Sequence, residues 1–261
     1  MITSDEPAEL GRELHKRYAA ADLAVLTSEE ASRFVPDGVG DPQADVSLAW
    51  ELLYRLEPEL YDRLISSEHL HPQLIDWLPR SVDRIVEVGA GTGRLTMELL
   101  DRGREVLAIE PAAGLRRILT SKLARSDLRH RARVSPGFFD DLPVPDDFAD
   151  LVVACSAFTP AAGHGGEDGL AEMERVCRPG GRVAIIWPKD VDWLLHRDYQ
   201  YRSFAGQMSM EFGSLGEAIE LAGIFYPRAV DEVRRRGSRR VPYQLLGVNP
   251  PRDVAFKVMP G

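Results

Sequence analysis

Hydrophobic positions follow a helical spacing in the first 80 residues of the chain. Apolar side chains recur every three to four residues in this part, for example at Leu10, Leu14, Tyr18 and Val25. Helices are expected near residues 7–26, 44–56, 58–65 and 71–78, with Pro79 ending the last of them. The pattern therefore predicts a helical N-terminal cap over residues 1–80.

From residue 82 the pattern changes to short β-rich runs that alternate with helical stretches. The runs cover residues 84–88, 105–109, 132–135, 149–154 and 182–187, and the helical stretches cover 94–101, 112–125 and 166–177. Gly103 and the pair Gly180-Gly181 are expected at helix ends. This alternation predicts an α/β fold, with a mainly parallel sheet that carries helices on both faces.

The alternation stops after Trp187. Residues 188–240 form an aromatic-rich stretch that is expected to be partly helical, as a lid insertion within a core of residues 81–261. Two closing strands are predicted over residues 241–246 and 253–258. The segment between them is short enough to make the two strands antiparallel.

Composition narrows the range of functions. A formal net charge of -9 argues against sequence-independent binding to nucleic acid, which needs a basic face, although Arg234 to Arg240 could hold an anion locally. Cys155 and Cys177 are too few for a disulfide framework. No stretch approaches the roughly 20 apolar residues of a membrane span, and the N-terminus lacks the features of a signal peptide. We expect a cytoplasmic protein with no membrane partner, and a homodimer is one candidate assembly.

A glycine-rich loop lies between the first β-rich run and the following helix, in the sequence VEVGAGTGRLT. Strand, glycine loop and helix together favour a nucleotide-like ligand, because glycines let the backbone approach it and the helix start favours negative charge. The dinucleotide pattern G-x-G-x-x-G requires glycine at the position of Arg94, whereas the third glycine is Gly93. The alternative is a tight turn without a ligand.

This loop resembles motif I of the class I S-adenosylmethionine-dependent methyltransferases. The resemblance implies that Glu87 helps to hold the amino group of the cofactor. It also implies that the backbone of Gly89, Ala90, Gly91 and Gly93 approaches its methionine part. Glu110, followed by Pro111, ends the next strand and takes the role of the acid that binds both ribose hydroxyls.

A second landmark supports the same family. The sequence RVCRPGGRV from Arg175 to Val183 resembles the turn before strand five of these methyltransferases. The resemblance covers residues 82 to about 187 and the final strands. It implies a Rossmann-like, mainly parallel seven-stranded sheet whose last strand is antiparallel.

The chain departs from the family after the third strand. Relatives carry an aspartate that binds the adenine amino group, and Phe138 stands in its place. Adenine could rest against Phe138, with its edge bound by the Phe139 backbone or by Asp140. The alternatives are an altered pocket with weak cofactor binding, or two phenylalanines that belong to the core.

Three further positions are candidates for the site. Cys155 follows the fourth strand and should border the cofactor, either as a small buried hydrophobe or as a nucleophile. His164, in the glycine-rich loop after that strand, is the candidate general base, and the alternative is an exposed histidine. Tyr61 resembles a tyrosine that touches the cofactor in relatives, or it belongs to an aromatic packing stripe.

The sequence thus predicts transfer of a methyl group from S-adenosylmethionine to oxygen, nitrogen or carbon of a small organic molecule, such as a specialised metabolite. S-adenosylhomocysteine would be the product of the cofactor, and no metal site is expected. Two alternatives stay open. One is a methyltransferase-like partner subunit that binds the cofactor weakly, and the other is an NAD-dependent oxidoreductase.

Overall fold

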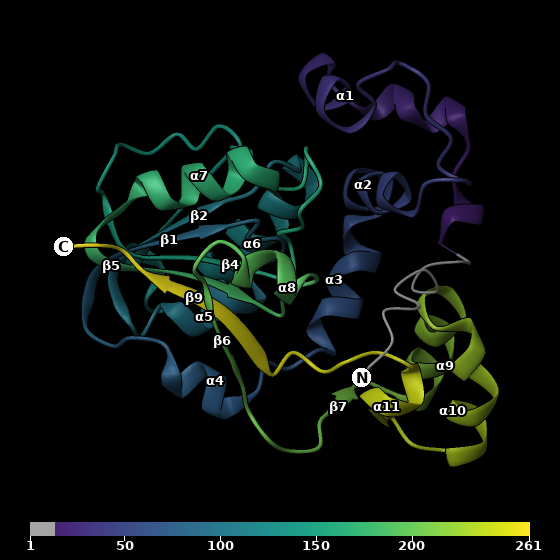
Figure 1. The fold of residues 1–261 in the computed structure, drawn as a ribbon. Helices are drawn as coiled ribbons and strands as arrows, with labels where there is room; N and C mark the ends of the chain where they lie inside the picture. Colours follow the sequence, from purple (N-terminus) through teal and green to yellow (C-terminus); the bar gives the residue numbers. More distant parts are fainter. Residues whose placement is uncertain (1–13) are drawn as a thin grey trace. The chain divides into compact units, whose positions relative to one another are not determined.

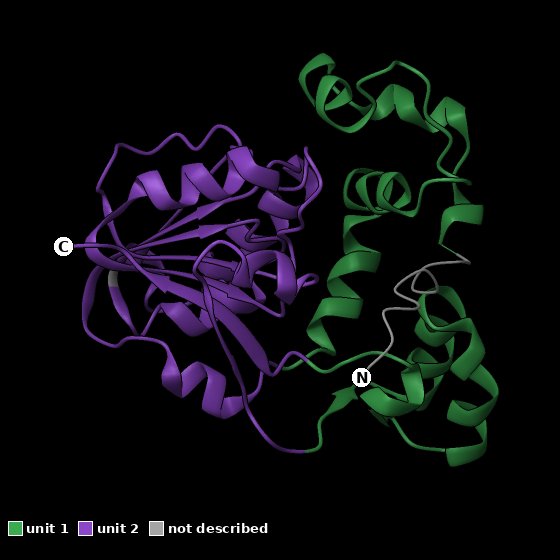
Figure 2. Ribbon diagram, viewed as in Figure 1, with its two compact units in different colours: residues 1–69, 207–250 green, residues 70–206, 251–261 purple. Residues whose placement is uncertain are grey.

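The computed structural model describes residues 14–261, and the Arg104 side chain is left out of this description. The chain forms two compact units (Figure 2), residues 1–69 with 207–250 and residues 70–206 with 251–261. The helix expected before the first strand and the segment 188–206 belong to the second unit. The beginning of the first predicted helix, including Leu10, lies outside the described residues.

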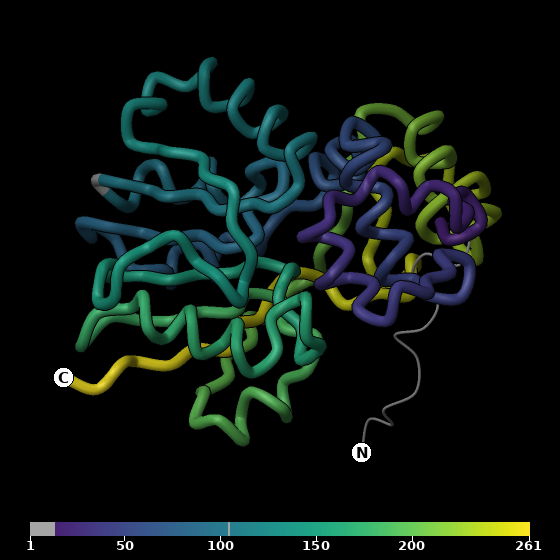
Figure 3. The backbone as a smooth tube through the Cα atoms, turned by 90° about the horizontal axis from the view of Figure 1, so that it is seen from above, coloured from purple at the N-terminus to yellow at the C-terminus, as the bar shows by residue number. Residues whose placement is uncertain are grey.

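The second unit is built on a seven-stranded sheet with the strand order β3-β2-β1-β4-β5-β9-β6. Its strands are β1 (Val82–Val88), β2 (Gly103–Ile109), β3 (Ala132–Ser135), β4 (Ala149–Cys155), β5 (Cys177–Ile186), β6 (Gln200–Ser203) and β9 (Asp253–Val258). Strands β1 to β5 are parallel, and β9 runs antiparallel between β5 and β6. In Figure 3 the yellow C-terminal segment runs alongside the green strands. The fold predicted from the sequence is confirmed.

Helices cover both faces of this sheet because successive residues of each central strand point to opposite sides. Ile85 packs on one face with α4 (Pro72–Trp77), α5 (Arg94–Leu99) and α6 (Ala113–Ala124). Val86 packs on the other face with α7 (Gly166–Val176) and α8 (Val191–Leu195), and α7 and α4 lie on opposite sides in Figure 1. A short 3-10 helix, η3 (Arg129–Arg131), precedes β3.

Two details of the predicted elements are wrong. Residues 241–246 do not form a closing strand of the sheet, because β8 (Arg240–Pro242) pairs with β7 (Ser209–Glu211) and α11 (Tyr243–Leu246) follows. The strand beside β9 is β6, which was missed because its four side chains are exposed and show no buried run. Gly103 begins β2, where its missing side chain leaves room for Ile85, and Gly180 and Gly181 lie within β5.

The first unit joins two distant parts of the sequence. It contains η1 (His15–Arg17), η2 (Ala20–Val25), α1 (Ser28–Phe34), α2 (Val46–Leu56), α3 (Pro58–Ser66), α9 (Leu215–Phe225), η4 (Pro227–Ala229) and α10 (Val230–Arg236), besides β7, β8 and α11. Arg63 on α3 forms ion pairs with Glu217 and Glu220 on α9. The rings of Trp50 and Phe225 stack at 5.6 Å, so the predicted N-terminal helices share a core with residues 207–250.

Candidate functional site

The order of the strands reverses between β1 and β4, because β1 pairs with β2 on one side and with β4 on the other. In open α/β sheets ligands bind outside the carboxyl ends of the strands at such a switch point. Glu87, Glu110 and Cys155 all lie at the carboxyl ends of these three strands. The structure therefore places these three predicted residues at the carboxyl ends of neighbouring strands.

The glycine loop is fixed to the end of β2 by its backbone. The N–H groups of Gly89 and Ala90 donate to the carbonyl oxygen of Ile109 at 2.9 and 3.0 Å. Gly89, Gly91 and Gly93 have φ angles of 71°, 57° and 94°, which lie in the left-handed region that favours glycine. The loop therefore needs glycine at these positions for its backbone conformation alone.

Packing inside the domain also requires two of the glycines. A Cβ atom at Gly89 would lie 2.5 Å from the Cβ of Ala157, and one at Gly93 would lie 2.4 Å from Leu119 Cδ1. The sequence attributed these glycines to the approach of a ligand. The structure gives Gly89 and Gly93 a second role, which is close contact with the segment after β4 and with α6.

Glu110 connects the end of β2 with the glycine loop. Its Oε2 atom accepts a hydrogen bond from Gly91 N at 2.9 Å, and its Oε1 atom accepts one from Ala112 N at 2.9 Å. The residue is 5% exposed. The two backbone bonds, one to each carboxylate oxygen, orient the group. Pro111 is half-buried, and its carbonyl accepts a hydrogen bond from Arg116.

Glu87 lies one strand away and is fully enclosed. Its Oε2 atom accepts a hydrogen bond from the Thr96 hydroxyl at 2.5 Å. Burial raises the pKa of Glu87 to about 8, while the Thr96 hydrogen bond and the charge of Arg94 act to lower it. Near neutral pH this carboxyl group is therefore largely protonated in the protein without a ligand.

The raised pKa of Glu87 predicts a pH-dependent effect of the Glu87→Gln substitution. Because the unfolded chain releases this proton near pH 4.5 and the folded chain near pH 8, wild-type stability falls as the pH rises through this window. Glutamine keeps the acceptor for Thr96 and removes the titration. The stability of the variant relative to wild type should be about 3 kcal/mol higher at pH 7 than at pH 4.5.

Urea unfolding of both proteins at pH 4.5 and pH 7 measures this difference, because all other titrating groups are shared. A stability difference that is the same at both pH values would show that Glu87 is ionised in the folded protein.

The segment after β3 forms a tight turn in which Asp141 N donates to the carbonyl oxygen of Phe138 at 3.3 Å. The Phe139 ring packs edge-on against Phe158 at 5.5 Å and belongs to the apolar core on the α7 face. A Cβ atom at Gly89 would lie 3.5 Å from Phe139 Cζ, so this ring also supports the glycine loop. The Phe138 side chain is half-buried and Asp140 is exposed.

Sequence reasoning missed three side chains at this edge. Arg94 donates from Nη2 to Cys155 Sγ at 3.3 Å, and its guanidinium lies 5.8 Å from the centre of the Trp187 ring. Trp187 follows β5 and, like Ser156 after β4, has a positive φ although it is not glycine. Thr96 is the third missed residue. The sequence places Thr96 in the first turn of the helix after the glycine loop, and this position could have indicated its contact with Glu87 on β1.

The remaining predicted residues are placed as follows. His164 lies in a loop that its backbone helps to close, because Thr159 N donates to His164 O at 2.8 Å. Its side chain is half-buried. Tyr61 lies on α3 in the first unit, where its ring packs edge-on against Tyr54 at 4.8 Å and Trp50 at 6.4 Å. The ring contacts confirm the aromatic packing predicted for Tyr61. The catalytic role of His164 and the cofactor contact of Tyr61 stay predictions.

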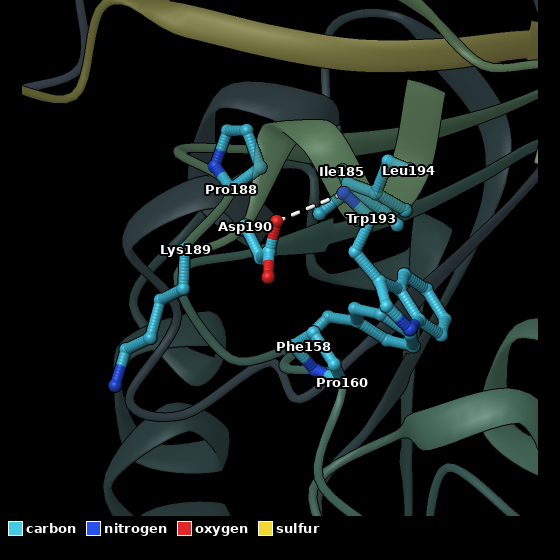
Figure 4. A pocket seen from close by; sticks show the side chains of 8 residues that line it. All are labelled: Phe158, Pro160, Ile185, Pro188, Lys189, Asp190, Trp193 and Leu194. Atoms are coloured by element: carbon cyan, nitrogen blue, oxygen red, sulfur yellow. Dashed lines mark hydrogen bonds between the residues drawn. The ribbon is translucent and has the colours of Figure 1, made fainter. Parts of the chain in front are cut away.

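A small hollow lies next to Phe158 in the second unit. Figure 4 shows that Trp193 and Phe158 border it, while the Lys189 side chain points away from them. Its lining residues are Phe158, Pro160, Ile185, Pro188, Lys189, Asp190, Trp193 and Leu194. Within residues 14–261, no group of three His, Cys, Asp or Glu side chains is placed to hold a metal ion, and no helix is long and apolar enough to cross a membrane.

Comparison with known proteins shows a similarity to methyltransferases over part of the chain. Residues 85–181 match the model of a methyltransferase domain. An uncharacterised methyltransferase of Mycobacterium tuberculosis is 32% identical over 120 residues, which cover 44% of each chain. An uncharacterised methyltransferase of Geobacillus kaustophilus is 34% identical over 101 residues, which cover 39% of this chain and 45% of the relative. The matches thus span less than half of either relative.

Among solved structures, a putative S-adenosyl-L-methionine-dependent methyltransferase from Methanococcus maripaludis aligns with a TM-score of 0.45 at 14% identity. The alignment covers 81% of this chain and 90% of that one. The strand order β3-β2-β1-β4-β5, followed by the antiparallel strand β9, agrees with the sheet that the sequence predicts. Residues 85–181 therefore belong to a methyltransferase domain.

Proposed function

We propose that the chain transfers a methyl group from S-adenosylmethionine to an oxygen, nitrogen or carbon atom of a small organic molecule, such as a specialised metabolite. The observation that carries the proposal is the hydrogen bond between Glu110 and Gly91 N. It joins the acid at the end of β2 and the loop at the end of β1 into one site at the switch point of the sheet.

The residues at this edge fit the chemical groups of the cofactor. Glu110 offers a buried carboxylate for two hydroxyl groups, and Glu87 offers an acceptor for an ammonium group. The Thr92 hydroxyl in the glycine loop is buried and has no hydrogen-bond partner within residues 14–261. Buried polar groups are normally paired, so this loop has hydrogen-bonding capacity left for a ligand.

When bound, the cofactor supplies an activated sulfonium methyl group that a nucleophile can displace directly. The contribution of the protein is then to hold the acceptor in line and to exclude water. Proton removal is needed only where the acceptor atom is protonated. His164 is our candidate for that role.

Phe138 favours a second candidate function, that of a partner subunit that binds the cofactor weakly. A phenylalanine side chain offers no hydrogen-bond acceptor to the adenine amino group that an aspartate binds in relatives. The edge of the adenine would then depend on backbone groups near Phe139 or on Asp140.

Calorimetry with S-adenosylmethionine, S-adenosylhomocysteine and NAD separates these functions. We expect the first two ligands to bind with one site per chain and NAD not to bind. Binding of NAD alone would contradict the methyltransferase function. Binding of none of the three would favour the partner subunit.

A further inference from the structure

Residues 234–240 connect α10 with β8 and form the densest run of arginines in the chain. Five of these seven residues are arginine, in the sequence RRRGSRR. The chain as a whole carries a formal net charge of -9, which opposes the binding of a long polyanion. The segment is therefore suited to a partner that offers a local acidic surface and contacts few other residues.

Ser238 is the hydroxyl residue inside this segment. Helix α10 ends at Arg236, Gly237 follows with a φ of 62°, and Ser238 lies in the loop before β8. The serine is partly exposed, and its Oγ atom accepts a hydrogen bond from Arg240 N at 3.1 Å in an exposed place. A Cβ atom at Gly237 would meet no described atom within 4 Å, so the space beside the serine is open.

Two of the arginines before Ser238 are held by weak contacts. On α10, Arg234 forms an ion pair with Asp231 at 3.1 Å, and both side chains are exposed. Arg235 forms one with Glu232 at 2.5 Å, and its guanidinium is exposed as well. Such surface pairs contribute less than about 1 kcal/mol, and the ends of a short helix fray readily. The two guanidiniums can therefore exchange these acids for the carboxylates of a partner at little cost.

We infer that Ser238 is a phosphorylation site for a serine/threonine kinase that recognises arginine on the N-terminal side of the acceptor. Carboxylates of such a kinase bind Arg235 and Arg236 through charge-assisted hydrogen bonds. The Ser238 Oγ atom then attacks the γ-phosphorus of ATP. The bond from this phosphorus to the β,γ-bridging oxygen breaks, ADP leaves, and a kinase carboxylate takes the hydroxyl proton. The site is independent of the proposed methyl transfer.

The surroundings of Ser238 also suit the product. A phosphoserine carries a charge of about −1.5 to −2 near pH 7 and three strong acceptor oxygens. Arg236 and Arg240 lie two residues before and two residues after Ser238, so both guanidiniums are within reach of the new phosphate. The phosphate would thus connect the end of α10 with the start of β8.

Thr120 is a competing site within the same chain. It follows Arg117 by three residues, and its side chain is exposed. However, Thr120 lies inside α6, whose hydrogen-bonded backbone keeps the segment from extending in a kinase groove. A kinase that responds to the fold as well as to the arginines should therefore modify Ser238 and leave Thr120 unmodified.

Incubation of the full chain with ATP and the catalytic subunit of cAMP-dependent protein kinase tests the inference, with the phosphate located by mass spectrometry of peptides. We expect one phosphoryl group per chain, on Ser238, and none in Ser238→Ala. Arg235→Ala should lower the initial rate at least about 10-fold, because it removes a charged contact with the kinase.

Arg228→Ala is the matched control, because it removes an exposed arginine ten residues before Ser238 and should keep the wild-type rate. Circular dichroism checks that each variant keeps the fold. If wild type takes up no phosphate, or takes it up on Thr120 or another residue and not on Ser238, the inference is wrong. An unchanged rate in Arg235→Ala would likewise overturn it, because the arginines would then not direct the kinase.

Discussion

Replacement of Glu110 by alanine is expected to weaken S-adenosylhomocysteine binding by at least about 100-fold and to lower the free energy of unfolding by about 3 kcal/mol. The binding loss follows from removal of the carboxylate that would accept the ribose hydroxyls. The stability loss follows because Gly91 N and Ala112 N lose a charged acceptor in a buried place. Calorimetry measures the first effect and urea unfolding the second.

Glu105→Ala is the matched control for this substitution. Glu105 lies on β2, the strand that Glu110 follows, but its ion pair with Arg133 spans 3.8 Å and is exposed to solvent. Pairs of this kind contribute less than about 1 kcal/mol, so the control should keep both stability and affinity. If wild type and Glu110→Ala bind S-adenosylhomocysteine with equal affinity, Glu110 does not bind the cofactor.

Replacement of Gly89 by alanine is expected to destabilise the protein by about 3 kcal/mol and to abolish cofactor binding. The left-handed backbone at φ 71° costs an L-residue about 1 kcal/mol. The new methyl group would also lie 2.5 Å from the Cβ of Ala157, which has no torsion by which to move away. Either the loop or the segment after β4 must therefore shift.

Two further variants separate these contributions. Gly180→Ala pays a similar backbone cost at φ 73°, but the nearest atom to its Cβ is the flexible end of Arg178 at 3.9 Å, so it should lose only about 1 kcal/mol. The double variant Gly89→Ala with Ala157→Gly removes the overlapping methyl group and should recover most of the steric loss. If Gly89→Ala costs no more than Gly180→Ala, the close contact between the two segments does not exist.

The sheet could be predicted from the sequence because its central strands are buried on both faces. Runs such as residues 84–88 and 149–154 consist mostly of apolar residues. Strand β6 carries no such pattern because it is an exposed edge strand, and its place depends on hydrogen bonds to β9, which lies 50 residues further along the chain. Such long-range pairing leaves no local signal.

Some residues of the candidate site could likewise be predicted from the sequence, and others could not. Glu87 and Glu110 could be found because each stands at a strand end at a defined spacing from the glycine loop. Arg94 was recognised only as the residue that breaks the dinucleotide pattern. Its contacts with Cys155 and Trp187 join segments more than 60 residues apart, and only the folded sheet brings them together. Similarly, Gly89 carries no sequence signal for its contact with Ala157.

A crystal structure with S-adenosylhomocysteine tests the central claim most directly, which is that the cofactor binds where β1, β2 and β4 end. The account predicts the ribose hydroxyls within hydrogen-bond distance of the Glu110 carboxylate and the amino-acid part beside the glycine loop. A ligand bound elsewhere, or one whose ribose makes no contact with Glu110, would contradict it.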